Sequence, residues 1–149
     1  MDHAAEIDMT GEYDRRPARV VIQVRCTDAP NTAEIGVRIA TFRLEAHYLC
    51  YVLWEDVRTL ARRVRVIHES LTGEASIGEA DGMLSFRVVD PGAGRIVVSG
   101  SFRHCTDTVA KNDAGLALRF DAFVIDQSLL PELARQLELA WEGKGDITH

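Results

Sequence analysis

The amino-acid sequence predicts an α+β domain, with two helices packed on one face of a mainly antiparallel sheet. Segments in which apolar and polar residues alternate, as they do in half-buried strands, stand in two groups. Each group is followed by a segment with apolar residues at three- and four-residue spacing, which is typical of an amphipathic helix. Strands joined by short connections favour antiparallel pairing, so we expect a two-layer architecture in the order βββαββββα.

Three strands are predicted between residues 18 and 52. From Ala18 to Cys26 apolar residues alternate with polar ones, and the Asp28-Ala29-Pro30-Asn31 segment that follows is a turn. The alternation resumes at Ile35, but its phase shifts near Ala40 and Thr41, where a bulge or a tight turn would absorb the slip. The inward residues after the shift are Phe42, Leu44, Ala46, Tyr48, Cys50 and Val52.

The first helix is predicted from its apolar stripe, and Gly73 supplies its stop. The stripe comprises Val57, Leu60, Ala61, Val64, Ile67, His68 and Leu71. Arg58, Arg62 and Arg65 share one flank of this helix. We interpret the flank as a solvated face on which Arg65 pairs with Glu69, and the alternative is a site for a nucleic acid or an acidic peptide.

Four strands and a closing helix are predicted after Gly73. The inward candidates are Ala75 and Ile77, then Leu84, Phe86 and Val88, then Ile96 and Val98, and finally Leu116, Leu118, Phe120 and Val124. The glycine-rich segment at 90–94 leads into a strand, so we interpret it as a hairpin turn and not as a phosphate cradle. A polar loop at 104–115 separates the last two strands. The closing helix runs from about Gln127 to Glu142, and Asp126 or Ser128 can cap it.

The chain length of 149 residues fits one domain, which we place at residues 18–143. Residues 1–17 lack periodicity and are expected to form a mobile arm, and residues 144–149 a C-terminal tail. Hydrophobic residues make up 46% of the chain, but no apolar run approaches the length of a membrane span. The beginning is acidic and polar, unlike a signal peptide, so we expect a cytoplasmic protein with no membrane contact.

The residues indicate no catalytic site, metal site or cofactor site. Cys26, Cys50 and Cys105 are widely spaced, so we interpret them as buried free thiols. His104 and Cys105 combine a base with a thiol, but neighbouring strand residues point to opposite faces and do not form a catalytic pair. The net charge of −6 disfavours nucleic-acid binding and suits a basic partner. We therefore expect a binding protein and not an enzyme.

The outer face of the predicted sheet is more apolar than a solvated face would be. We predict that it forms the partner or self-association surface, centred on Tyr51 and Phe123, because alternation places both side chains opposite the core. The predicted partner-binding residues are Val21, His47, Leu49, Tyr51, Arg87, Val97, Arg119, Asp121 and Phe123. The alternative is that the N-terminal arm, the long loop or a second copy of the chain covers this face.

Three segments resemble the WapI-like bacterial immunity proteins, over a region from about Val20 to Trp141. They are Leu71-Thr72-Gly73-Glu74-Ala75 after the first helix, Gly94-Arg95-Ile96-Val97-Val98 after the hairpin turn, and Asp126-Gln127-Ser128-Leu129-Leu130-Pro131 at the start of the last helix. The resemblance implies a cytoplasmic protein that binds and neutralises the toxin domain of a polymorphic toxin system. A basic toxin would suit the acidic chain. The alternative function is a homodimeric ligand-binding or scaffold domain without catalytic activity.

Overall fold

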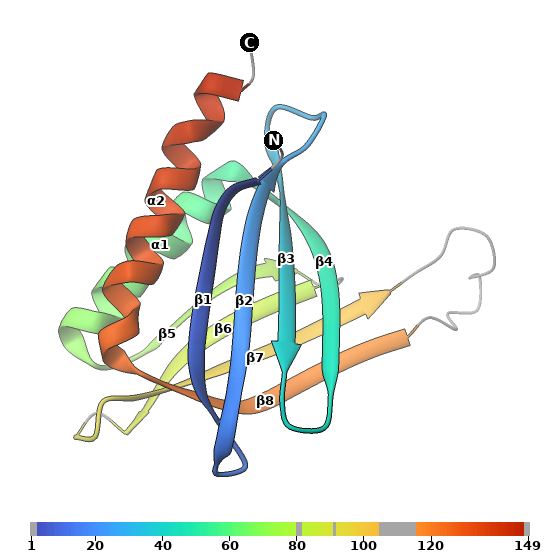
Figure 1. The fold of residues 1–149 in the computed structure, drawn as a ribbon. Coiled ribbons are helices and arrows are strands. Elements are labelled where there is room, and N and C mark those ends of the chain that lie inside the picture. Colours follow the sequence, from blue (N-terminus) through green and yellow to red (C-terminus); the bar gives the residue numbers. More distant parts are fainter. Residues whose placement is uncertain (1–2, 80–81, 91, 105–115, 148–149) are drawn as a thin grey trace.

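The computed structural model describes residues 3–79, 82–90, 92–104 and 116–147, and Figure 1 shows their arrangement. The loop predicted at 104–115 and the thiol of Cys105 therefore lie outside the described residues, except for the backbone of His104. The elements, in chain order, are β1 (His3–Tyr13), β2 (Arg16–Cys26), β3 (Thr32–Ala40), β4 (Glu45–Leu53), α1 (Trp54–Ser70), β5 (Glu74–Glu79), β6 (Gly82–Asp90), β7 (Arg95–His104), β8 (Leu116–Asp126), the short 3-10 turn η2 (Gln127–Leu129) and α2 (Leu130–Ile147).

The first strand corrects the prediction of a mobile N-terminal arm. Residues 3–13 form β1, which pairs with β2 along its length through a turn in which Asp14 and Arg15 have positive φ angles of 56° and 64°. Ala5, Ile7 and Met9 alternate with charged and polar residues, and all three are buried. This period-two pattern is sufficient to hold a strand against a core.

The eight strands of the described residues belong to one antiparallel sheet, in the order β4-β3-β2-β1-β8-β7-β6-β5. This confirms the predicted α+β class and the antiparallel sheet, with one strand added at the start. The sheet folds back on itself, because Tyr48 of β4 stacks on Phe102 of β7 with ring centroids 5.9 Å apart. Figure 1 shows β1 to β4 crossing in front of β5 to β8. The inner faces of two four-stranded halves therefore meet in one core.

A turn explains the predicted phase shift after β3. The Thr41 N–H donates to the Leu44 carbonyl at 2.8 Å, and the Leu44 N–H donates to Thr41 Oγ1 at 3.1 Å. The hairpin register from Ala40 and Glu45 onward then continues without a slip to the end of β4. The segment from 35 to 52 is thus two strands, and the apolar side chain of Phe42 lies in the turn between them.

Both helices pack against the inner side of the sheet. Helix α1 contacts β5 and the end of the β3–β4 hairpin, and α2 contacts β1 and β2. The buried residues of α1 include the predicted stripe positions Val57, Leu60, Ala61, Val64 and Ile67. The helix ends earlier than predicted, because Leu71 adopts the left-handed conformation and donates its N–H to the Ile67 carbonyl at 2.8 Å. No helix in the described ranges combines the length and the apolar character needed to cross a membrane.

The arginine flank of α1 faces α2. Arg65 forms two hydrogen bonds to the Glu138 carboxylate, at 2.6 and 2.7 Å, in place of the predicted pair with Glu69. The Arg58 guanidinium lies 4.6 Å from the ring centroid of Trp141. Through Arg58 and Arg65 the flank therefore contributes to helix–helix packing. The predicted cap Asp126 accepts the Ser128 N–H at 2.8 Å at the start of η2, and α2 begins later than predicted, at Leu130, and continues to Ile147.

Candidate partner-binding surface

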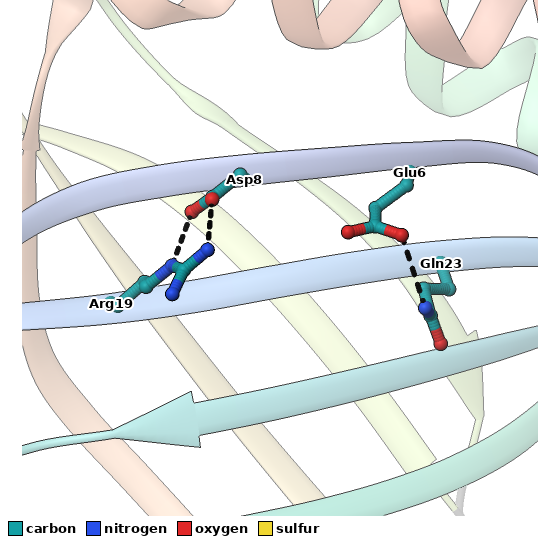
Figure 2. A network of polar contacts seen from close by, with 4 residues as sticks. All are labelled: Glu6, Asp8, Arg19 and Gln23. Atoms are coloured by element: carbon teal, nitrogen blue, oxygen red, sulfur yellow. Dashed lines mark hydrogen bonds and ion pairs between the residues drawn. The ribbon is translucent and has the colours of Figure 1, made fainter.

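The outer face of β1 and β2 carries charged side chains that bind one another. Figure 2 shows Arg19 and Asp8 forming a two-point contact across the strands, with an Nε to Oδ1 distance of 2.8 Å, and Gln23 donating to Glu6 at 3.3 Å. The hydrogen bond from Arg19 holds the pKa of Asp8 below its ordinary value. The polar groups of this strip therefore have partners within the chain.

The outer side of β4 is different, because it carries three large apolar side chains in consecutive outward positions. Leu49 is 46% exposed, Tyr51 65% and Leu53 54%. His47 and Glu45 continue the same row and are also exposed. A row of exposed apolar side chains on one strand is unusual for a surface that stays in water, and it is typical of an interaction site.

Residues of the neighbouring strand β3 orient the side chains of this row. Glu34 accepts a hydrogen bond from the Tyr51 hydroxyl at 3.3 Å, and the negative charge of Glu34 raises the pKa of Tyr51. At Gly36, a β-carbon would lie only 3.3 Å from Leu49 Cδ2 and from His47 Nε2. The glycine therefore leaves room for the Leu49 and His47 side chains to lean over β3.

The structure brings four of the nine predicted site residues together on this half of the sheet. His47, Leu49 and Tyr51 lie on β4, and Val21 lies two strands away on the outer side of β2. Val21 is only 8% exposed, so it offers little surface to a partner even though its strand position faces outward.

The other five predicted residues do not join them. Arg87 of β6 and Val97 of β7 are registered partners on the second half of the sheet. Because the inner faces of the two halves pack together, their outer faces point in different directions. Arg119, Asp121 and Phe123 belong to β8, where they line a hollow. The predicted single surface is therefore divided into separate regions.

The outward placement of Phe123 is wrong. Phe123 is 2% exposed and lies in the core, whereas Val124, predicted to point inward, is only half-buried. The cause is a register shift between β7 and β8: Gly100 pairs with Phe120, but Val98 pairs with Phe123. One extra residue in β8 reverses the alternation after Phe120, as a β-bulge does. Because aromatic and β-branched residues lie on both sides of the bulge, the sequence alone does not show which face of β8 is buried.

The hollow has a volume of about 380 Å³ and lies where the β1–β2 turn, the β3–β4 turn and β8 meet. Its apolar lining includes the core residues Ile39 and Phe123 together with the exposed Phe42 and Leu44. Arg16 and Arg43 both lie over the ring of Phe42, with guanidinium carbons 4.2 and 5.1 Å from its centroid. These two contacts hold Phe42 in place at the rim.

The two thiols in the described part of the chain, those of Cys50 and Cys26, are buried or half-buried. Cys50 is buried on the inner side of β4, and burial raises the pKa of its thiol to about 11. Cys26 is half-buried, and burial raises its thiol pKa as well. Both thiols are therefore protonated and poorly nucleophilic at neutral pH. Within the part of the chain that the structure describes, no three His, Cys, Asp or Glu side chains gather into a group that could hold a metal ion.

Comparison with known proteins gives one match. The model of the immunity protein WapI-like family matches residues 6–142, a region that begins in β1 and ends in α2. No curated protein and no solved structure matches the chain.

Proposed function

Because the chain belongs to the WapI-like immunity protein family, we propose that it binds one cognate toxin domain and neutralises it by stoichiometric occlusion in the bacterial cytoplasm. The observation that carries this proposal is the family match, which spans the sheet, both helices and the exposed row of β4. An immunity protein acts through a protein partner, and the partner is a toxin. In this proposal the chain blocks the toxin by binding and performs no turnover.

The outer row of β4 is the surface that best suits such a partner. Tyr51 and Leu53 are more than half exposed in the free chain, so a partner that covers them removes a large apolar area from water. Aromatic side chains at the centre of an interface often cost about 2 kcal/mol or more of binding free energy when truncated. Tyr51 is the aromatic residue of this row, and its hydroxyl is already oriented by Glu34.

The charge of the chain favours a basic toxin. The chain has 23 acidic and 17 basic residues, giving a net charge of −6. Complementary charge speeds the encounter of two proteins and discriminates against wrong partners more than it strengthens the final complex. We therefore expect association with the toxin to slow as salt is added.

The test first looks for a toxin gene directly upstream, where an immunity gene's partner is expected, and then titrates the chain with that toxin's C-terminal domain, inactivated in its own active site. Isothermal titration should give one toxin per chain, and co-expression should restore growth to cells that produce the active toxin. Tyr51→Asp should weaken binding more than tenfold, which corresponds to at least about 1.4 kcal/mol. Leu139→Asp is the matched control, because Leu139 is 45% exposed but lies on α2.

The outcomes separate the function from the surface. If the wild-type chain neither binds the toxin domain nor protects cells, the proposed function is wrong. If it does both and Tyr51→Asp behaves like Leu139→Asp, the toxin binds elsewhere, and the hollow beside Phe42 is the next surface to test. Sedimentation of the free chain decides the homodimer alternative, which requires a dimer without toxin.

A further inference from the structure

We propose that β4 receives an extended segment of the toxin as an added strand, through hydrogen bonds between the segment's backbone and the free edge of β4. The inference rests on the proposed function, because the toxin supplies the segment. It adds a mode of recognition: the backbone of β4 provides pairing groups, and its outer row provides apolar contacts to alternate side chains of the segment.

Strand β4 is a regular edge strand. It stands at the end of the sheet order, and within the described part of the chain it pairs with β3 alone. Its nine residues keep one register with β3 from Glu45 to Leu53, without a bulge. The strand contains no proline, glycine or lysine, which are common means of blocking further pairing at an edge. Figure 1 shows α2 on the β1 side of this half, away from β4.

Two backbone hydrogen bonds at the ends of the hairpin fix the direction of the backbone groups along β4. At one end the Thr41 N–H donates to the Leu44 carbonyl, and at the other the Trp54 N–H donates to the Asn31 carbonyl at 2.9 Å. In an antiparallel pair, residues bonded to the neighbour alternate with residues whose N–H and C=O point away from it. Because the register does not slip, the backbone N–H and C=O groups of the even-numbered residues from 44 to 54 point toward β3.

The odd-numbered residues of β4 therefore direct their N–H and C=O groups to the free edge. The N–H of Leu53 is taken by the Asp56 carboxylate at 3.2 Å, which ends the free stretch. Among the described residues, no hydrogen bond engages the outward N–H and C=O groups of His47, Leu49 and Tyr51, so they form a ladder for a new strand. These are also the residues whose side chains form the exposed outer row, so one added strand would pair with the backbone and cover Leu49 and Tyr51 together.

The opposite edge of the sheet is less suited to pairing. Strand β5 has six residues, against nine in β4. Its Gly78 has a φ of 109°, which departs from an extended strand, and its inward residues Ala75 and Ile77 are buried beside α1. Short and irregular edges resist the addition of another strand. Of the two edges, only β4 thus offers both a regular ladder and exposed apolar side chains.

The charges at the two ends of β4 indicate the chemistry of the added segment. The apolar row is followed by His47 and Glu45 on one side and by Glu55 and Asp56 on the other, and Glu34 lies beside Tyr51. A segment with apolar residues at alternate central positions and Lys or Arg at both ends matches this pattern. A toxin domain of basic composition can supply it.

A second copy of the chain fits this edge less well. An antiparallel, two-fold pairing of β4 with itself centred on Cys50 pairs His47 with Leu53 of the other copy and brings Glu45 toward the first turn of its α1, which carries Glu55 and Asp56. Centring the pairing on Leu49 still brings the acidic ends of the two copies close together. Like charges brought close together repel each other, so the edge favours a basic segment over self-pairing.

Amide hydrogen exchange of the full-length chain, followed by NMR with and without the inactivated toxin domain, tests this proposal without a mutation. The amides of His47, Leu49 and Tyr51 should exchange rapidly in the free chain and roughly 100-fold more slowly in the complex. The amides of Tyr48 and Cys50 face β3, so they should be protected in both states and serve as internal controls.

A pair of variants separates backbone pairing from side-chain contact. Leu49→Pro removes an N–H that points to the free edge and leaves the bonds to β3, whereas Leu49→Ala removes the side chain and keeps the N–H. We expect Leu49→Pro to weaken toxin binding about tenfold more than Leu49→Ala does.

Each outcome has a distinct meaning. Toxin binding without slower exchange at His47, Leu49 and Tyr51 would overturn the added strand and leave the proposed function standing. Absence of toxin binding would overturn the proposed function and, with it, this inference. Slower exchange in the free chain at higher protein concentration would identify a second copy as the occupant and also overturn the inference.

Discussion

Replacing Phe123 with Ala tests the reversed facing of β8, because an outward and an inward Phe123 predict different stabilities. The side chain is 2% exposed in the core. Burial of a large aromatic side chain and the cavity left by its removal together cost about 3–5 kcal/mol in folding free energy. On one side the ring tip meets β1, where a β-carbon on Gly11 would lie 3.1 Å from Phe123 Cζ. The surrounding backbone therefore has little room to collapse into the void.

The hollow beside Phe123 determines where in this range the loss of folding free energy for Phe123→Ala falls. Phe123 lines the hollow on its other side, so water can enter part of the space that the ring leaves. We therefore expect a loss of about 3–4 kcal/mol for Phe123→Ala, measured by urea unfolding with an unchanged m-value. Tyr51→Ala is the matched control, because its side chain is 65% exposed, and it should change stability by less than about 0.5 kcal/mol. Equal, small losses for both variants would show that Phe123 points outward and that the bulge in β8 is wrong.

Two further predictions concern the β1–β8 junction and the helix pair. Gly11→Ala should destabilise the chain by more than about 2 kcal/mol in thermal unfolding, because its β-carbon would lie 2.1 Å from the Val124 carbonyl oxygen. Gly143→Ala in α2 is the control and should be neutral or stabilising, because a β-carbon there meets no atom within 4 Å. A mild effect of Gly11→Ala would contradict the close approach of the two strands. The Arg65–Glu138 pair should couple by about 0.5 kcal/mol in a double-mutant cycle at pH 7, since both side chains are partly exposed. Arg65 lowers the pKa of Glu138, so the coupling should be present above the ordinary Glu pKa and disappear as the pH falls through the lowered value; a coupling that persists in acid would refute the ion pair.

Much of the fold follows from period and spacing in the sequence. The strands from β2 to β8 and both helices overlap the predicted segments, because each has one buried face and a regular alternation or stripe, but Phe42 and Leu44, predicted to point inward, are exposed in the turn before β4. The alternation in β1 is as regular, with Ala5, Ile7 and Met9 on one side, but its many charged residues favoured the prediction of a mobile arm. Those charges are satisfied across the strands, as the Arg19–Asp8 contact shows, and cross-strand partners are not visible in one segment alone.

The candidate surface could be predicted only in part. Alternation placed His47, Leu49 and Tyr51 outward correctly, because β4 runs without a bulge between two clear turns. It failed at Phe123, where one inserted residue reverses the facing and where both alternatives are hydrophobic. The folding of the sheet onto itself also separated Arg87 and Val97 from Tyr51. Such long-range geometry depends on how the two halves pack, which the period of a single strand does not encode.

The position of β1 in the sheet leaves β4 with a free edge, although β1 contributes no side chain to the exposed row. Strand β1 pairs with β2 along its length and meets β8 at the pairing of Glu12 with Val124, so it joins two groups of four strands into one sheet. That junction covers the edges of β2 and β8 and leaves β4 and β5 as the ends. Since β5 is short and irregular, the order of strands leaves a single regular edge, and that edge carries Leu49 and Tyr51. In the proposed mode of recognition, the topology of the whole sheet therefore sets where a partner strand adds, and the side chains of β4 select that partner.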